Sequence, residues 1–513
     1  MTGVPRRVLT SALERAGLLV AEHGVMPRDL TGIADDSRAV LQGGLFVAVR
    51  GSARDGHEFL AAAATKGAAA AIVEDASRTE LPAIVVTDAR RAAAVAASAF
   101  YDHPSAGMKL VAVTGTNGKT TTVGMLRHLL DADGARSASI GTLGVLVGSA
   151  GRPLEGGAGL TTPGPVETQR VLRELAGEGV RTVAMEVSSH ALDQHRVEGI
   201  AFDAAVFTNL TRDHLDYHGT MDAYRAAKES LLAHLAPDGV AVRNADDPAW
   251  GARVVVGAAQ GTSATGALSF GTSVHADVRA TDVRFTARGS VWILSAFGAE
   301  REVRLPLIGD FNVSNALAAA AAACAVGLDL GTIALRLSSM PQVPGRLEIL
   351  SERPTVLRDY AHTPDALERA LTALRPFTAG SLIVVFGAGG DRDRGKRPLM
   401  GQVAVRCADR VIVSSDNPRT EDPDAIIDEI VAPLPAGRFE RIADRRAAIA
   451  RALSLAHPAE DVVLIAGKGH ETYQVRGDTK YPFDEKQIVA DLLAGVLAGV
   501  TAGVTAGVTD AAP

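Results

Sequence analysis

Residues 110–122 read LVAVTGTNGKTTT, and this stretch decides the fold of the central part of the chain. A short apolar run leads into a turn that contains Gly115 and Gly118, and a lysine and three threonines follow. Glycine permits backbone geometry and a close approach that a side chain forbids, so the amides of such a turn can face phosphate oxygens. We therefore predict a strand, a phosphate-binding turn and a helix, in a protein that uses ATP.

Phosphate chemistry suggests roles for the residues after this turn. Lys119 is placed to contact the outer phosphates, and Thr120 or Thr121 at the start of the helix can offer a hydroxyl to Mg²⁺. The strict phosphate-loop pattern requires a glycine five residues before Gly118, where this chain has Val113, so the motif is a shortened variant. The alternative interpretation is a strand–turn–helix connection that merely favours glycine.

Length and composition limit the class of protein. The 513 residues are too many for one hydrophobic core and indicate about three domains. The net charge of −7 is small for this size, so no broad basic field indicates nucleic acid or an anionic membrane surface. Cys324 and Cys407 lie far apart in the chain, which favours reduced thiols over a disulfide or metal framework.

Targeting and membrane segments are not indicated by the sequence. The N-terminus lacks the long apolar segment of a signal peptide. The apolar run at 316–328 is shorter than the ~20 residues that cross a bilayer, and it predicts a buried alanine-rich helix. We expect a cytoplasmic protein with no membrane insertion, and we expect a monomer.

The pattern of strands and helices predicts an α/β fold with three domains. The first hundred residues hold a strand candidate at 45–49 and an alanine-rich helix leading into 70–73. From residue 110 onward, strands alternate with helices, which indicates a mostly parallel sheet covered on both faces, and we expect strands at 182–187, 203–207 and 239–243 and again at 381–386, 410–414 and 462–465. Two strand-like runs between 283 and 294 predict an appended β-hairpin. The predicted domains are 1–105, 106–340 and 341–495, followed by a low-complexity tail at 496–513 with no assigned chemistry.

Acidic and histidine residues follow the phosphate-binding turn along the chain. Glu186 closes a predicted strand, and the carboxyl ends of parallel strands are where open α/β sheets bind ligands. Together with Thr120 it could form the protein half of a Mg²⁺ site, although a carboxylate that caps the helix starting at Ser188 is an equal alternative. Further on, TNLTRDHLDYHG places His214 among acidic residues in a loop, which favours a site. Lys228, on a helix that Thr220 could cap, would by itself be interpreted as a solvated lysine.

Eight motifs in order resemble the Mur ligases of peptidoglycan synthesis, in particular their diaminopimelate-adding (MurE-type) members. The motifs are TGTNGKTTT, MEVSSHAL, TNLTRDHLDYHG, GDFNVSNALAA, DYAHTPDAL, GAGGDRDRGKRP, DNPRTEDP and AGKGHETY. The resemblance covers residues 35–473 and implies the three-domain Mur ligase architecture. An N-terminal domain would bind the UDP-sugar, a central phosphate-loop domain with a parallel sheet would bind ATP, and a Rossmann-like C-terminal domain would bind the amino acid.

The resemblance also implies a reaction. Such enzymes phosphorylate a carboxylate with ATP, and an amine then attacks the acyl phosphate to give an amide. Both steps build negative charge, so catalysis is expected to rest on positioning and on electrostatic stabilisation by Lys119, Mg²⁺ and fixed donors. The substrates implied are UDP-MurNAc-L-Ala-D-Glu and diaminopimelate, in cytoplasmic synthesis of cell-wall precursors.

Metal and nucleotide positions come from the same resemblance. Glu186 and His214 match metal-holding residues, and Lys228 matches a lysine carried as an N-carboxylated (carbamate) side chain formed from CO₂. A desolvated neutral amine can capture CO₂ and become an anionic oxygen ligand for a second Mg²⁺. The implied ATP-binding residues are Thr114, Gly115, Thr116, Asn117, Gly118, Lys119, Thr120, Thr121, Asn312, Arg346 and Asp359. Closure of the third domain would complete the site.

Substrate positions are implied at both ends of the chain. The residues that match the UDP-MurNAc-dipeptide site are Asp35, Ser37, Ser52, Ala53, Arg54, Thr161, Thr162, Ser188, Gln194 and Arg196. Those that match the diaminopimelate site are Arg392, Asp416, Asn417, Pro418, Arg419, Gly467 and Glu471. Arg419 can grip the distal carboxylate with two hydrogen bonds, while Asp416 and Asn417 suit an ammonium group. Lysine would leave the guanidinium unpaired and be rejected by about 10⁴-fold or more.

Other functions remain as alternatives. Folylpolyglutamate synthesis uses the same acyl phosphate chemistry, but the DNPR and DDSR elements argue against it. A non-catalytic nucleotide-binding scaffold or ATPase switch would keep the turn without the ligase reaction. The run FGAGGDR lacks the glycine spacing of a dinucleotide fingerprint, so we expect no NAD. Both meso- and LL-diaminopimelate carry the distal groups, and the sequence favours neither.

Overall fold

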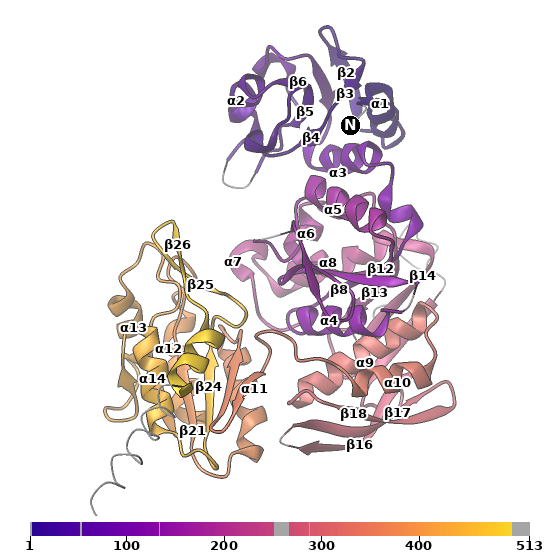
Figure 1. The fold of residues 1–513 in the computed structure, drawn as a ribbon. Coiled ribbons are helices and arrows are strands. Elements are labelled where there is room, and N and C mark those ends of the chain that lie inside the picture. The colour runs from indigo at the N-terminus through magenta and orange to yellow at the C-terminus, as the bar shows by residue number, and fades with distance from the viewer. Residues whose placement is uncertain are drawn as a thin grey trace, which may run out of the picture. The chain divides into compact units, whose positions relative to one another are not determined.

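The computed structural model describes residues 3–51, 54–132, 134–157, 159–250, 266–286 and 288–494. These residues form two compact units (Figure 1). The first comprises Met1–Val283, Trp292–Val303 and Val313–Ser339, and the second comprises Arg284–Val291, Arg304–Asn312 and the chain from Met340 onward. The predicted tail at 496–513 lies outside the described residues.

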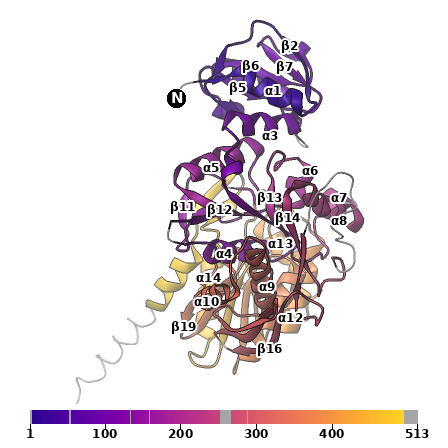
Figure 2. The ribbon, with the colours of Figure 1, turned by 90° about the vertical axis from the view of Figure 1, so that its right-hand side faces the viewer.

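A five-stranded sheet with helices around it forms the N-terminal part of the first unit. The strands, in sheet order, are β2 (Leu19–His23), β7 (Ala83–Val86), β6 (Ala68–Val73), β5 (Gly44–Val47) and β4 (Ile33–Ala34). The helices are α1 (Arg6–Arg15), α2 (Leu60–Thr65) and α3 (Ala89–Phe100). Asp88 starts α3, because its carboxylate accepts the amide hydrogens of Arg90 and Arg91. The alanine-rich α3 packs against α5 (Pro165–Gly177) of the central part (Figures 1 and 2).

The central sheet has parallel strands at its middle, as the alternating pattern predicts. Its order is β11 (Arg152–Leu154), β10 (Gly144–Val147), β9 (Arg136–Gly141), β12 (Val180–Glu186), β8 (Lys109–Thr114), β13 (Phe202–Phe207), β14 (Leu235–Asn244), β15 (Gly266–Gly271), β16 (Val278–Thr286), β17 (Gly289–Ala296) and β18 (Ala299–Leu305). Strand β8 pairs in parallel with β12 and β13, and Glu186 lies opposite Val113. Apolar side chains of these strands are buried in the core. Because the three neighbouring strands run in parallel, their carboxyl ends meet at one edge of the sheet.

Helices cover this sheet and are joined by the loops that hold the predicted site residues. They are α4 (Lys119–Leu129), α5, α6 (Ser189–Asp193), α7 (Leu215–His218), α8 (Met221–Glu229), α9 (Asp310–Ala325) and α10 (Leu330–Ser338). The alanine-rich helix expected at 316–328 is α9, which starts earlier and ends at Ala325, because Gly327 has φ +97°. The predicted hairpin at 283–294 corresponds to β16 and β17, which extend beyond it at both ends.

The second unit is an α/β layer structure with a six-stranded sheet. Its order is β19 (Glu348–Glu352), β20 (Thr355–Asp359), β24 (Val462–Ala466), β21 (Leu382–Phe386), β22 (Arg410–Val413) and β23 (Glu440–Arg441). The covering helices include α11 (Pro364–Leu374), α12 (Lys396–Cys407), α13 (Pro423–Val431) and α14 (Arg445–Leu455). A two-stranded ribbon, β25 (Tyr473–Arg476) with β26 (Thr479–Pro482), follows β24. All neighbours from β20 to β23 pair in parallel, as in doubly wound sheets.

None of the helices among the described residues combines the length and the apolarity that crossing a bilayer would require.

Candidate active site

The glycine turn between β8 and α4 has the geometry that the sequence predicts. Gly115 has φ +145° and Gly118 has φ +85°, both outside the range that side-chain-bearing residues favour. A Cβ atom on Gly115 would lie 1.9 Å from the Thr208 hydroxyl oxygen, and one on Gly118 would lie 2.3 Å from Asn315 Oδ1. Both positions therefore require glycine.

Hydrogen bonds to the end of β13 hold this turn in place. The Thr116 amide donates to the Asn209 carbonyl at 2.8 Å, and the Asn117 amide donates to Asn209 Oδ1 at 2.9 Å. The Thr208 hydroxyl donates to the Asn117 carbonyl at 2.6 Å. The turn is thus preorganised by protein contacts, as a phosphate-binding backbone should be.

Two lysines donate to one carbonyl oxygen in this turn. Lys119 Nζ and Lys228 Nζ lie 2.8 Å and 2.9 Å from the Gly115 carbonyl oxygen. Lys228 is 1% exposed, so its interpretation as a solvated lysine is wrong. Burial lowers the pKa of Lys228 well below its usual value, and the adjacent Lys119 charge lowers it further. The structure therefore favours a neutral Lys228 amine.

Glu186 is buried at the end of β12 and accepts three hydrogen bonds. The Thr120 hydroxyl donates to Oε2 at 3.1 Å, and Thr142 donates its amide to Oε1 at 2.8 Å and its hydroxyl to Oε2 at 3.1 Å. The helix-cap interpretation of Glu186 is wrong, because Ser188 caps α6 by accepting the Ala191 amide. A hydroxyl and a carboxylate beside the phosphate-binding turn are hard oxygen donors, and this donor set fits Mg²⁺.

A cluster of rings surrounds His214. Its ring centroid lies 4.8 Å from that of His190 and 6.2 Å from that of Tyr224. His218 belongs to the same cluster, and its Nε2 lies 2.9 Å from the Ser189 hydroxyl. Desolvation lowers the pKa of His214, and the charge of Lys119 acts in the same direction. A neutral imidazole is the form that binds metals.

The predicted metal positions combine unlike donors. The Thr120 hydroxyl contacts Glu186 Oε2 directly, at 3.1 Å. Within the described part of the chain, no group of three or more His, Cys, Asp or Glu side chains has the arrangement of a metal site. A magnesium site here would accordingly depend on hydroxyl, phosphate and carbamate oxygens as well as on Glu186 and His214.

The predicted dipeptide-binding residues meet behind Glu186. The Thr162 hydroxyl donates to the Glu186 carbonyl at 2.9 Å and accepts the Ser188 amide at 3.0 Å. Arg196 donates to the Thr162 carbonyl at 2.8 Å and to Gln194 Oε1 at 2.7 Å. The Thr161 hydroxyl oxygen lies 3.3 Å from that of Thr142, which completes the group.

The predicted uridine-nucleotide positions are only partly described. Desolvation raises the pKa of the Asp35 carboxyl, and the charge of Arg196 opposes that rise. Ser37 starts a short 3₁₀ helix, and Arg54 is exposed. Ser52 and Ala53 lie outside the described residues. Asp35 is thus the member of this group that the structure brings near the dipeptide residues.

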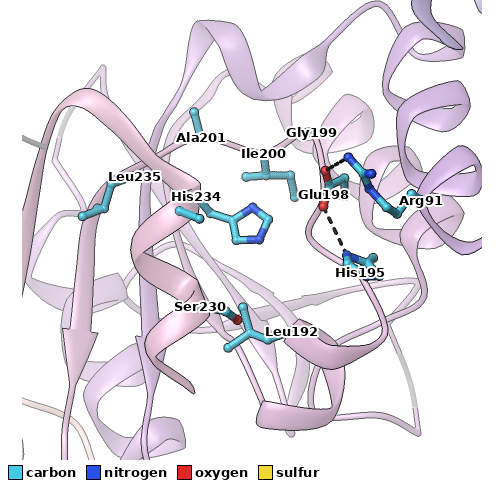
Figure 3. Close-up of a pocket in the computed structure, with 11 residues that line it drawn as sticks. Arg91, Leu192, His195, Glu198, Gly199, Ile200, Ala201, Ser230, His234 and Leu235 are labelled. Carbon is cyan, nitrogen blue, oxygen red and sulfur yellow. Dashed lines mark hydrogen bonds and ion pairs between the residues drawn. The ribbon is translucent and has the colours of Figure 1, made fainter. Parts of the chain in front are cut away.

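A cavity of about 800 Å³ is lined by Arg91 of α3 and by residues from the segments 192–201 and 230–235 (Figure 3). Glu198 accepts from Arg91 of α3 at 3.2 Å, and its other oxygen lies 3.3 Å from His195 Nδ1. No predicted site residue is among those that line this cavity. The ion pair between Arg91 and Glu198 instead joins α3 to the loop that carries Gln194 and Arg196.

The predicted adenine and ribose positions lie in the second unit. Asp359 is partly buried at the end of β20 and accepts the Leu347 amide at 2.7 Å. Burial raises the pKa of Asp359, and Arg346 is the nearest opposing charge. The Arg346 guanidinium lies 4.9 Å from the Tyr360 ring centroid. Asn312 stands in the first turn of α9 and donates to the Ile308 carbonyl at 2.7 Å.

The predicted diaminopimelate residues converge at the carboxyl ends of β22 and β24. A Cβ on Gly389 would lie 2.9 Å from Arg419 Nη1 and 3.8 Å from Arg392 Cγ, so two arginines flank this glycine. Asp416 Oδ2 is buried with no hydrogen-bond partner among the described residues, and a Cβ on Gly467 would lie 2.4 Å from it.

The other members of this group contact one another. Asn417 Nδ2 donates to Glu471 Oε2 at 2.8 Å, and the Pro418 carbonyl oxygen packs 1.9 Å from where a Cβ on Gly390 would stand. Arg419 has φ +53° and donates to the Gly390 carbonyl at 2.8 Å. The loop is therefore tightly fitted against the glycine-rich segment that follows β21.

Sequence reasoning missed several residues at these sites. Thr142 follows β9, and His190 lies in the first turn of α6, which follows β12. Both stand at the same sheet edge as Glu186, and this position could have indicated them. Lys468 and Arg445 are fully buried beside the predicted diaminopimelate residues. For Lys468 the signal was its place inside the AGKGHETY motif, and for Arg445 the sequence held none.

Three family models match the chain in succession. They are the Mur ligase family catalytic domain at residues 29–103, the Mur ligase middle domain at 113–323, and the Mur ligase glutamate ligase domain at 345–469. These matches confirm the predicted family and the predicted α/β architecture. The roles of the individual site residues stay predictions.

Curated relatives are similar over nearly the whole chain. The UDP-N-acetylmuramoyl-L-alanyl-D-glutamate–2,6-diaminopimelate ligase of Geobacillus kaustophilus is 44% identical over 91% of this chain and 95% of its own length. The enzyme of the same name from Synechococcus elongatus is 44% identical over 92% of this chain and 95% of its own length.

Solved structures share the fold. A structure with the same enzyme name is 33% identical, with a TM-score of 0.67, and the match covers 96% of this chain and 99% of that one. Folylpolyglutamate synthase of Mycobacterium tuberculosis, solved with ADP and AMPPCP, is 21% identical with a TM-score of 0.61, over 72% of this chain and 91% of its own. This second likeness shows the fold alone.

Proposed function

The chain belongs to the Mur ligase family, and from this premise we propose that it uses ATP to add diaminopimelate to the D-Glu carboxylate of UDP-MurNAc-L-Ala-D-Glu. The observation that carries the choice of amino acid is the loop at 416–419. Arg419 of this loop and Arg392 flank Gly389. A buried oxygen of Asp416 has no hydrogen-bond partner among the described residues. Such a pair of opposite charges suits the carboxylate and ammonium at the distal end of diaminopimelate.

The reaction has two balanced steps. An oxygen of the substrate carboxylate attacks the terminal phosphorus of ATP, and ADP leaves. The amine of diaminopimelate then attacks the carbonyl carbon of the acyl phosphate, gives up a proton, and phosphate leaves. The amides of the turn at 115–118 and Lys119 bind and orient the phosphates, which makes the attack effectively intramolecular.

Mg²⁺ fits the oxygen donors beside this turn. Thr120, Glu186, His214 and a carboxylated Lys228 would hold it, and when bound it neutralises charge on the phosphate oxygens. Thr142 orients the Glu186 carboxylate through two hydrogen bonds. The ring of His190 packs edge-on against His214 and limits its rotation.

Carboxylation of Lys228 follows from the crowding of two lysines at one oxygen. Both amines donate to the Gly115 carbonyl, so two positive charges there would repel each other. If the neutral Lys228 nitrogen attacks CO₂ and releases a proton, it becomes an anion that attracts Lys119. We expect Lys228→Ala to lose activity that added bicarbonate does not restore, with a ¹³C carbamate signal only in the unsubstituted protein. Full activity in Lys228→Ala would remove this role.

The three predicted domains divide the binding of the substrates in this proposal. Residues 1–105 bind the uridine nucleotide, 106–340 bind ATP and the dipeptide, and 341–495 bind diaminopimelate. The partners are small molecules, the protein works as a monomer, and its place is the cytoplasm, where nucleotide-linked precursors and ATP occur. Light scattering of the purified chain should give one chain's mass of 53.1 kDa, and a stable dimer would refute the monomer.

An amino-acid panel tests the function. With ATP and UDP-MurNAc-L-Ala-D-Glu present, phosphate release should require diaminopimelate, in either the meso or the LL form, and lysine should not replace it. Arg419→Ala should raise the KM for diaminopimelate far more than the KM for ATP, while the exposed Arg438→Ala should change neither. Phosphate release without the amino acid would instead indicate an ATPase switch, and equal coupling of lysine would refute the proposed selectivity.

A further inference from the structure

Lys468 is a fully buried lysine directly beneath the predicted diaminopimelate residues. It lies just past the end of β24, and its side chain is 0% exposed. Its Nζ donates to Asn417 Oδ1 at 2.9 Å and to Glu471 Oε2 at 3.1 Å. Because Asn417 Nδ2 also donates to Glu471 Oε2, at 2.8 Å, the three side chains close a ring of hydrogen bonds.

Backbone contacts fix the orientation of this ring. The Val475 amide donates to Asn417 Oδ1 at 2.9 Å, so two donors, this amide and Lys468, face the same amide oxygen. Asn417 must therefore present Nδ2 on the other side, toward Glu471. Both hydrogen bonds to Glu471 fall on Oε2, so its second oxygen is directed away from the ring.

Three carboxylates gather close to Lys468. Besides Glu471 they are Asp416, with its unpartnered buried oxygen, and the fully buried Glu485, which pairs with Arg445 at 2.7 Å. Lys468 pairs with Glu471 at 3.1 Å, and Arg445 pairs with Glu485 at 2.7 Å. Asp416 Oδ2 is the carboxylate oxygen of this group that is buried with no hydrogen-bond partner among the described residues, and an ammonium group could donate to it.

We propose that Lys468 is a positioning residue of the amino-acid site, which holds Asn417 and Glu471 so that they and Asp416 form an acceptor site for the ammonium group beside the distal carboxylate of the incoming amino acid. The inference rests on the proposed function and deepens it. Lys468 itself does not touch the substrate, because its charge is used by Asn417 and Glu471 inside the protein. Its removal leaves Glu471 without its cation and frees the Asn417 amide to rotate.

Steady-state kinetics of the full chain test this role. Lys468→Met keeps the length of the side chain and removes its charge, and it should raise the KM for diaminopimelate about 10- to 100-fold, as expected for a lost charge-assisted hydrogen bond. The KM values for ATP and UDP-MurNAc-L-Ala-D-Glu should stay unchanged. The matched control is Lys480→Met in β26, an exposed lysine 4.2 Å from the centroid of Tyr473, the ring that Lys468 approaches at 5.8 Å. This control should keep all three KM values.

A double variant separates positioning from a general structural role. If Lys468 acts through Glu471, Lys468→Met should add little to Glu471→Gln, so the KM for diaminopimelate in the double variant should match that of Glu471→Gln within about twofold. The double variant also removes the buried charge pair as a whole, so it decides the matter if Lys468→Met alone fails to fold.

The outcomes are distinguishable. If the unsubstituted protein couples diaminopimelate and a folded Lys468→Met has an unchanged KM for it, or if all three KM values rise together, the positioning role is rejected and the proposed function stands. If the effects of Lys468→Met and Glu471→Gln simply multiply, the role through Glu471 is also rejected. If the unsubstituted protein forms no product with diaminopimelate, the proposed function itself fails.

Discussion

The ion pair between Arg445 and Glu485 gives a sharp prediction about stability. Both side chains are 0% exposed, and Arg445 Nε lies 2.7 Å from Glu485 Oε1. Arg445 also donates to the Ala466 carbonyl at 2.8 Å and to the Ser415 carbonyl at 3.4 Å, so it joins the ends of β24 and β22. Replacing Arg445 by methionine fills most of its volume but leaves Glu485 buried without its cation.

The expected loss follows from desolvation. Breaking a buried pair by removing one partner costs about 3–5 kcal/mol, because the remaining charge keeps no compensation. Burial already raises the pKa of Glu485, and Arg445 is the largest opposing influence. For a unit of this size, about 2–4 °C of melting temperature corresponds to each kcal/mol, so Arg445→Met should lower the melting temperature by about 6–20 °C.

The neighbouring residue supplies a matched control. Arg446 follows on the same helix, α14, and pairs with Asp491 at 4.0 Å, with both side chains about half exposed. Arg446→Met removes an equal charge from an exposed pair, which is worth about 0–1 kcal/mol. The double variant Arg445→Met/Glu485→Leu should regain most of the lost stability, since it leaves no unpaired buried charge.

Differential scanning calorimetry of the full-length variants measures these effects. If Arg445→Met melts within 2 °C or so of Arg446→Met, a difference below roughly 1 kcal/mol, the reasoning about buried charge is refuted. A double variant as unstable as Arg445→Met would show that lost packing, and not the unpaired carboxylate, is responsible.

Two further predictions concern the first unit. Gly115→Ala should reduce ATP turnover about 100-fold or more without unfolding the protein, because its Cβ would stand 1.9 Å from the Thr208 hydroxyl and displace the carbonyl oxygen that both lysines share. The control is Gly107→Ala, whose Cβ would have no heavy atom within 4 Å. Equal ATP turnover by the two variants would contradict the geometry. Burial raises the pKa of the Cys324 thiol to about 11, so little thiolate exists at pH 8 and iodoacetamide should alkylate Cys324 roughly 100-fold more slowly than an ordinary free cysteine. Its rate should rise tenfold per pH unit up to about 11, as followed by mass spectrometry, and a rate that levels off near pH 9 would disprove the shift.

Local sequence carried much of the candidate site. The spacing of Gly115 and Gly118 between an apolar strand and a lysine predicts the phosphate-binding turn, because only glycine fits those backbone positions. The rule that ligands gather at the carboxyl ends of parallel strands placed Glu186 next to this turn. The pairing of Glu186 opposite Val113 in the structure agrees with that placement.

Contacts between distant residues were beyond local patterns. Lys228 lies 113 residues from Gly115, and a single helical lysine gives no sign that the rest of the fold covers it. Likewise Arg445 and Glu485 are 40 residues apart, in stretches that look like ordinary charged helices. Such pairs form only when the order of strands in the sheet brings two segments together, and no periodicity within either segment records that order.

The sequence by itself determined the α/β class, the glycine turn and the family, because these depend on neighbours in the chain and on motifs that keep their order. The tertiary structure alone decided that two lysines share one oxygen, that Thr142 donates to Glu186, and that a buried Lys468 donates to Asn417. Burial and charge pairing are properties of the folded surroundings. A side chain acquires its pKa and its partner only when chain segments far apart in sequence have packed around it.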